Sequence, residues 1–255
     1  MVSTIVGIDA AVAPERTGVA VGHRLHHGGW QITAFPPTKS HDTLRSRVAS
    51  AVVDADGPPL LAIDSPLGWP RLLGAELSEH RAGRPLSHAA NELFRRETDR
   101  RVRDLLGKQP LDVGADRIAR TAVAVLALVD EVSRATGICF DLAWDPSVEA
   151  PSMIEVYPAS WLIVRRCPAA GYKRPTGGTA RARIMAELEE SGMRFVNPEV
   201  PAACADVLDA SITVQLGIEF LSGRCIGPDD QHLAETEGWI WIPTPQHDEN
   251  RRCRN

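Results

Sequence analysis

Three aspartates lie where an α/β sheet usually carries its chemistry. Asp9 closes the β-branched run TIVGIDA (4–10), Asp64 closes the buried run LLAID (60–64), and Asp209 belongs to a late helical segment. Ligands of open α/β sheets bind beyond the carboxyl ends of the strands, and these two strands become neighbours if the first hairpin lies to one side. Carboxylates held close together repel unless they share a cation. The pattern predicts an oxygen-ligand site for Mg²⁺ or Mn²⁺.

Two further carboxylates extend this predicted acidic cluster. Asp206 precedes Asp209 by three residues, so the two share one face of a helix, and both are candidate metal ligands. Glu155 lies inside the predicted strand 153–158, where it either faces the metal or is a solvated side chain. Each aspartate alone has a simpler interpretation, because strand-end aspartates often form turns and aspartates near a helix start offset its dipole. The prediction therefore depends on the whole set.

The segment RRETDRRVR is dense in charge. On the helix expected over 88–107, Arg96, Asp99, Arg100 and Arg103 fall on one face and are candidates for binding a substrate phosphate. A solvated surface helix explains the same pattern and is the favoured interpretation.

The segment CPAAGYKRPTGGT (167–179) offers a second group of candidates. Lys173 and Arg174 are candidate anion ligands there, and Lys173 is also a candidate to assist catalysis. The alternative is a plain mobile loop, because the segment is rich in glycine and proline.

Other catalytic patterns are missing from the sequence. Ser65 follows Asp64 without a GxSxG elbow, and neither GxGxxG nor GxxxxGK[ST] occurs. These absences disfavour a serine hydrolase, a Rossmann cofactor and a P-loop nucleotide site.

The elements that must position these residues follow an α/β order. Runs at 4–10, 17–23 and 30–35 predict an antiparallel meander of three strands. A helix over 43–55 and a strand at 60–64 then form a crossover unit, which makes the fourth strand parallel to a strand of the meander.

The later segments complete the sheet and cover it. Residues 66–150 are expected as a helical insertion over one face of the sheet, in which the helix 115–136 is apolar on most sides and deeply packed. The remaining expectations are a strand at 153–158, helices at 159–166 and 179–192, an amphipathic helix at 205–223, an edge strand at 239–243 and a frayed end at 248–255.

Length and composition limit the class of protein. A chain of 255 residues with 44% hydrophobic and 24% charged residues is expected to form one domain, 1–255. The sequence has no signal-peptide pattern and no apolar run of about 20 residues, and its five cysteines form no CxxC pair. We therefore expect a cytoplasmic protein without a membrane partner. The net charge of −5 leaves only a local basic patch for nucleic acid, and the oligomeric state, a homodimer included, stays open.

Several segments together resemble the predicted nuclease family catalogued as domain of unknown function 429. They are GIDAA, AIDSPLGWP, RRETDRRVR, IEVYPASW with GYK, DVLDASITV and EGWIWIP, and they span nearly the whole chain. The resemblance implies a ribonuclease H-like fold: a mixed five-stranded sheet, its first three strands antiparallel, flanked by helices.

The resemblance also implies an acidic active site made of Asp9, Asp64, Glu155 and Asp209. Asp99, Arg103 and Lys173 match positions typical of the family. This chain departs from the family in the first hairpin, where AAVAPERTG replaces the usual glycine and tryptophan.

Three functions follow as expectations. The first is a metal-dependent nuclease or phosphodiesterase acting on nucleic acid. The second is a nucleotide-binding phosphotransfer protein of the actin and sugar-kinase kind, which would require a glycine-rich phosphate hairpin, whereas the first hairpin here offers only Gly18 and Gly22. The third is a non-catalytic binding module on the same fold.

Overall fold

The centre of the fold is a pair of parallel strands that carry the first two aspartates. In the computed structural model, which describes residues 1–114 and 116–245, β1 (Thr4–Asp9) and β4 (Leu60–Asp64) pair in parallel. Both strands are buried up to their final aspartates, and most of their side chains are aliphatic, as expected for parallel strands covered on both faces. The register sets Asp9 directly opposite Asp64, which confirms the prediction that these two strands are neighbours.

The predicted antiparallel meander is confirmed, but the sheet is larger than expected. It has nine strands rather than five, in the order β7-β3-β2-β1-β4-β6-β9-β8, with β5 pairing to β6. Six of the nine correspond to strands expected individually from the sequence. The other three, β5, β7 and β8, have only two or three residues each, too few to show an alternating pattern. The strand at the end of the chain is β9, and β8 lies beyond it, so β9 is not an edge strand. The remaining strands are β2 (Gly18–Arg24), β3 (Trp30–Phe35), β5 (Asp141–Leu142), β6 (Ser152–Val156), β7 (Met193–Phe195), β8 (Cys225–Ile226) and β9 (Ile240–Pro243).

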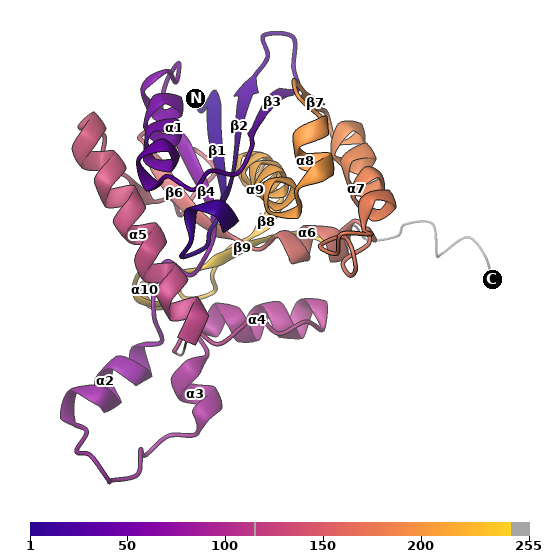
Figure 1. Ribbon diagram of the computed structural model, residues 1–255. Coiled ribbons are helices and arrows are strands. Elements are labelled where there is room, and N and C mark those ends of the chain that lie inside the picture. The colour runs from indigo at the N-terminus through magenta and orange to yellow at the C-terminus, as the bar shows by residue number, and fades with distance from the viewer. Residues whose placement is uncertain (115, 246–255) are drawn as a thin grey trace.

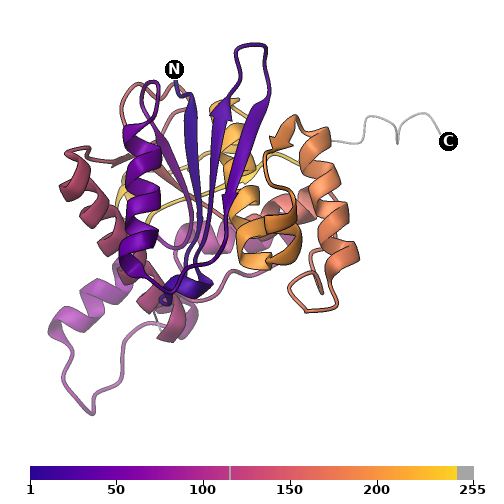
Figure 2. The ribbon, with the colours of Figure 1, turned by 45° about the horizontal axis from the view of Figure 1, so that its top comes forward.

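Helices cover both faces of this sheet (Figures 1 and 2). Ile5 of β1 belongs to a core shared with α6, α7 and α9, whereas its neighbours Val6 and Ile8 belong to a second core shared with α1 and α5. The alternation of side chains along a strand therefore decides which helix layer each residue meets. The helices are η1 (Pro14–Arg16), α1 (His41–Val53), α2 (Arg71–Glu79), α3 (Ala90–Phe94), α4 (Glu97–Leu106), α5 (Asp116–Thr136), α6 (Pro158–Val164), α7 (Gly178–Glu190), α8 (Glu199–Ala203), α9 (Ala205–Leu221) and α10 (Gln231–Glu237).

Helix α9 is buried on every side, which corrects the prediction of an amphipathic helix. All residues from 207 to 220 are buried, because β1 and β2 lie against one side and α6, α7 and α8 against others. Two glycines allow this close approach. A Cβ atom at Gly7 would overlap the carbonyl oxygen of Ala210, and one at Gly18 would overlap that of Asp206. The helix that carries Asp209 thereby lies directly on the strand that carries Asp9.

Helix α5 is less buried than its sequence indicates. Only one of its faces is buried, through residues such as Val125 and Val132, while Val123 is 60% exposed. The helix packs on α1 in the outer layer and leaves its other face to solvent, so apolar character on most sides does not become deep packing here.

The predicted helix 88–107 is two helices. Arg95 and Arg96 adopt extended backbone angles between α3 and α4, and the Asp99 carboxylate accepts a hydrogen bond from the Arg96 backbone N–H. Helix α4 therefore begins after Arg96, and of the four predicted charged residues only Asp99, Arg100 and Arg103 lie within it.

The region predicted as an insertion supplies both an arm and part of the site. Helices α2 and α3 extend away from the sheet in both views, while α4 lies beside its carboxyl edge (Figures 1 and 2). None of the helices within residues 1–114 and 116–245 combines the length and the apolar character needed to cross a membrane. The frayed end predicted at 248–255 lies outside the described residues.

Candidate carboxylate site

Asp9 and Asp64 form the base of the site. They are the last register pair of β1 and β4, and strand alternation turns both side chains to the sheet face covered by α9. Burial, followed by the charge of Asp209, raises the pKa of each carboxyl well above its ordinary value, and that of Asp64 reaches about 7. Two adjacent carboxylates with raised pKa values are a strong attractor for a cation.

Asp209 completes the group from α9. Its side chain is 1% exposed, and Lys173 Nζ lies 2.5 Å from Asp209 Oδ2. The Tyr172 hydroxyl donates to the same carboxylate at 2.8 Å. Desolvation lowers the pKa of Lys173, but the charges of Asp209 and Asp9 outweigh it and leave that pKa raised. Lys173 is therefore the charged counter-ion of the acidic cluster in this structure.

Asp206 lies at the margin of the cluster. Its carboxylate pairs with Arg16 of η1 at 3.1 Å, and its charge is among those that raise the pKa of Asp9. Asp206 and Asp209 lie three residues apart on α9, as predicted. Asp206, however, already has a cationic partner in Arg16.

Glu155 is held in a separate buried ion-pair network. Both of its oxygens accept hydrogen bonds from the Arg96 guanidinium at 2.7 Å, and one also accepts from the Leu67 backbone N–H at 3.0 Å. Asp99 pairs with the other side of the same guanidinium at 3.0 Å. Glu155 follows strand alternation onto the face opposite to Asp64, since its register partner is Ile63. A catalytic role for Glu155 stays a prediction, while these contacts give it a structural one.

The four residues predicted to bind phosphate in the segment RRETDRRVR fall into two groups: Arg96 and Asp99 belong to this buried network, and Arg100 and Arg103 do not. Arg96 and Asp99 are each 1% exposed, and the Arg96 guanidinium is already paired with the carboxylates of Asp99 and Glu155. Arg100 and Arg103 are exposed, and they bind the Arg95 carbonyl oxygen and Asp104 respectively. Of the four predicted residues, only Arg100 and Arg103 are therefore available to a ligand at the surface of α4.

The loop that carries Lys173 is pinned rather than mobile. The buried guanidinium of Arg181 donates to the carbonyl oxygens of Tyr172 at 2.6 Å and Arg174 at 3.1 Å. Its Nε also donates to the carbonyl oxygen of Ala202 at 2.7 Å. The expected flexible segment is thus fastened to α7 and α8.

Two cavities meet at the cluster. The first, called the Asp9 cavity, has a volume of 290 Å³ and is lined by Asp9, Asp64 and Ser65 together with Arg96 and Glu155. The second, called the Tyr172 cavity, has a volume of 380 Å³ and is lined by Asp64, Asp209, Tyr157, Tyr172 and three basic residues. Asp64, Tyr157 and Lys173 line both cavities, so an occupant of either one lies next to the carboxylates.

Ser65 supplies an observation that points to a ligand. It is 5% exposed, and its Oγ has no hydrogen-bond partner among the described residues. Buried hydroxyls normally find a partner. Its position in the Asp9 cavity, directly after Asp64, makes it available to a bound group.

The donor chemistry of the site fits a hard divalent cation. Asp9, Asp64 and Asp209 offer the carboxylate oxygens that Mg²⁺ and Mn²⁺ prefer. Within the part of the chain that the structure describes, no three such side chains are arranged so that they could hold a metal as they stand. The ion pair of Lys173 with Asp209 is consistent with this, because the ammonium group takes the place of a cation on the third carboxylate.

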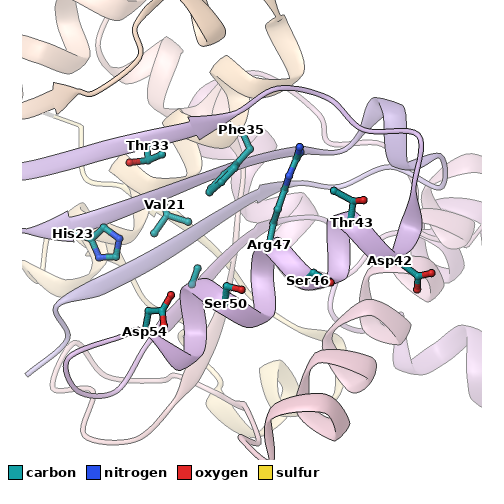
Figure 3. A pocket seen from close by; sticks show the side chains of 11 residues that line it. Val21, His23, Thr33, Phe35, Asp42, Thr43, Ser46, Arg47, Ser50 and Asp54 are labelled. Atoms are coloured by element: carbon teal, nitrogen blue, oxygen red, sulfur yellow. The ribbon is translucent and has the colours of Figure 1, made fainter.

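A larger cavity lies elsewhere. It has a volume of 540 Å³ and separates α1 from β2 and β3, with His23 and Asp54 towards one end and Arg47 reaching across to Phe35 (Figure 3). The Arg47 guanidinium covers the Phe35 ring at 5.5 Å. No predicted site residue lines this cavity, so volume alone does not identify the chemistry.

Four residues of the site were missed by sequence reasoning: Ser65, Tyr157, Tyr172 and Lys108. Ser65 and Tyr172 adjoin predicted residues, which is the one signal that could have found them. Lys108 comes from the segment after α4, and only the fold brings it to the cavity.

The fold and the site together define a class: an α/β protein with a buried group of carboxylates at the carboxyl edge of its central parallel strands. A family model described as "protein of unknown function (DUF429)" matches residues 7–233. The chain belongs to this family, which confirms that part of the resemblance. No curated protein and no solved structure matches the chain.

Proposed function

We propose that this protein is a metal-dependent phosphodiesterase that acts on nucleic acid. The observation that carries the proposal is the convergence of Asp9, Asp64 and Asp209 in one buried site. We also propose that the sheet is of the ribonuclease H-like kind. The central order β3-β2-β1-β4-β6, with an antiparallel meander followed by parallel strands, supports this.

Asp9, Asp64 and Asp209 would hold Mg²⁺ or Mn²⁺. The bound metal would activate a water molecule and stabilise the charge that develops on the phosphoester oxygens. Tyr172 orients the Asp209 carboxylate through its hydroxyl, and Lys173 offers a positive charge to a phosphate when a cation takes its place on Asp209. The Ser65 hydroxyl is placed to donate a hydrogen bond to a substrate oxygen in the Asp9 cavity.

The nucleotide-phosphotransfer alternative has less support. It requires glycines that leave a hairpin backbone open to phosphates, and both glycines of the first hairpin are used for packing. A Cβ atom at Gly18 would overlap the carbonyl oxygen of Asp206, and one at Gly22 would overlap the Cγ1 atom of Val214 on α9. Stabilisation by ATP with Mg²⁺ in a thermal-shift assay would favour this alternative.

The test is Asp9→Asn in a Mn²⁺-dependent cleavage assay on single-stranded and duplex nucleic acid. We expect the variant to lose cleavage and to keep its fold by circular dichroism. Asp130→Asn is the matched control, because Asp130 is exposed on α5 and pairs only with Arg134 among the described residues. Equal cleavage by Asp9→Asn and the wild type would contradict the proposal, and absence of Mn²⁺ binding in calorimetry would favour a non-catalytic binding module.

A further inference from the structure

The Tyr172 cavity has a composition that the carboxylate site alone does not explain. Both tyrosines of the chain and two of its three lysines, Lys108 and Lys173, line it. These residues come from three separate segments: the segment after α4, the junction of β6 with α6, and the loop before α7. Basic and aromatic residues that are scarce in the sequence are therefore concentrated beside Asp64 and Asp209.

Two of the cations in this cavity are not used by the protein. Lys173 pairs with Asp209, but neither Lys108 nor Arg174 has a carboxylate partner among residues 1–114 and 116–245. Lys108 Nζ lies over the ring of Tyr157 at 5.9 Å, a contact that positions the ammonium group without neutralising it. Two positive charges are thus available to an anion.

The cavity is built before any ligand arrives. Arg181 holds the backbone at Tyr172 and Arg174, and the Tyr172 hydroxyl is fixed on Asp209. Groups that are already ordered lose little conformational entropy on binding, which favours specific recognition.

Charge and size together indicate the ligand. A phosphomonoester carries a charge of about −1.5 to −2 near neutral pH, which two free cations can balance. The volume of 380 Å³ lies at the small end of the range for enclosed small-molecule sites, enough for about one nucleotide unit. A continuous duplex backbone requires an extended surface rather than such a cavity.

We propose that the Tyr172 cavity binds a phosphomonoester group, with Lys108 and Arg174 as its charge partners. This inference rests on the proposed function and narrows the ligands of that site: the group is the terminal phosphate of a nucleotide strand, which is a substrate, or a mononucleotide, which is a cleavage product, and it lies beside Asp64. An internal phosphodiester, with one negative charge, is not the preferred ligand.

The test is isothermal titration of the metal-free protein with inorganic phosphate, adenosine monophosphate and adenosine. We expect phosphate and the monophosphate to bind and adenosine not to bind. Lys108→Met and Arg174→Met should each weaken binding of the monophosphate at least about tenfold, the equivalent of one lost charge contact of about 1.4 kcal/mol. Lys39→Met is the matched control, since Lys39 is exposed and lines none of these cavities. Absence of phosphate binding, or wild-type affinity for the monophosphate in both variants, would overturn the inference.

Oligonucleotides distinguish the two sources of the phosphate. If a 5′-phosphorylated single strand binds as tightly as the monophosphate and a 5′-hydroxyl strand does not, the ligand is a strand end. If neither strand binds as tightly, the ligand is a free mononucleotide. If the hydroxyl strand binds as tightly as the monophosphate, internal phosphates suffice and the inference is overturned.

Asp9→Asn separates this inference from the proposed function. The variant should lose cleavage and keep its affinity for the monophosphate, because Asp9 does not line the Tyr172 cavity. A wild-type protein that binds the monophosphate but cleaves nothing refutes the phosphodiesterase proposal alone. One that cleaves but does not bind it refutes this inference alone.

Discussion

Asp9 and Asp64 face each other as the last register pair of two parallel strands, and both are turned towards the helix that carries Asp209. This arrangement gathers negative charge in a buried place. Lys173 offsets part of that charge through its ion pair with Asp209.

The metal-free protein should lose stability as the pH rises from about 4 to about 7. Burial and Asp209 raise the pKa of Asp64 to about 7, whereas the unfolded value is about 3.9. Across this range the folded chain holds a proton that the unfolded chain has released, so the free energy of unfolding falls as the pH rises. At about 1.4 kcal/mol per pKa unit the loss is at most about 4 kcal/mol.

Urea unfolding in the presence of a chelator, repeated across this range, measures the effect. Asp64→Asn should flatten the profile and stabilise the protein above about pH 7. The exposed Asp130→Asn should follow the wild type. A wild-type profile without this slope would contradict the electrostatic account of the cluster.

Lys173→Met should tighten Mn²⁺ binding by about tenfold, because it removes the cation that competes for Asp209. Isothermal titration with Mn²⁺ gives the affinity directly. Lys39→Met should leave it unchanged. An unchanged or weaker affinity in Lys173→Met would show that Lys173 does not occupy the place of a metal.

Arg96→Met should destabilise the protein by about 3–5 kcal/mol, because it removes the cation that pairs with the buried carboxylates of Glu155 and Asp99. Arg96→Lys should recover little of this loss, since one ammonium group cannot replace a guanidinium that binds two carboxylates. Chemical denaturation measures both variants. Arg100→Met, at an exposed position of α4, should change the free energy of unfolding by no more than about 0.5 kcal/mol.

Gly7→Ala should cost about 1–3 kcal/mol of stability and weaken Mn²⁺ binding. The added methyl group would overlap the Ala210 carbonyl oxygen and push α9, with Asp209, away from β1. Gly74→Ala is the matched control. A Cβ atom there meets nothing within 4 Å, so this change in α2 should be neutral or stabilising by up to about 1 kcal/mol. Similar losses of stability in both variants would argue against the close packing of α9.

The sequence by itself determined the central part of the fold and the location of the acidic cluster. The apolar patterns of strands depend only on residues that are close in the sequence. Such patterns were enough to predict β1, β4 and the antiparallel meander. Strand ends then fixed where Asp9 and Asp64 would lie, and helical spacing joined Asp206 to Asp209. The sequence did not predict the strands of two or three residues or the break between α3 and α4 at Arg96. Segments this short show no repeating hydrophobic pattern.

Only the tertiary structure decided which charges neutralise one another. Arg96 meets Glu155 from 59 positions away in the sequence, and Tyr172 meets Asp209 from 37. Such pairs depend on where loops lie after the sheet has formed, and no local pattern encodes that. For the same reason the sequence could group Glu155 with the other carboxylates, whereas the pleat of β6 turns Glu155 to the opposite face, where a buried arginine binds both of its oxygens.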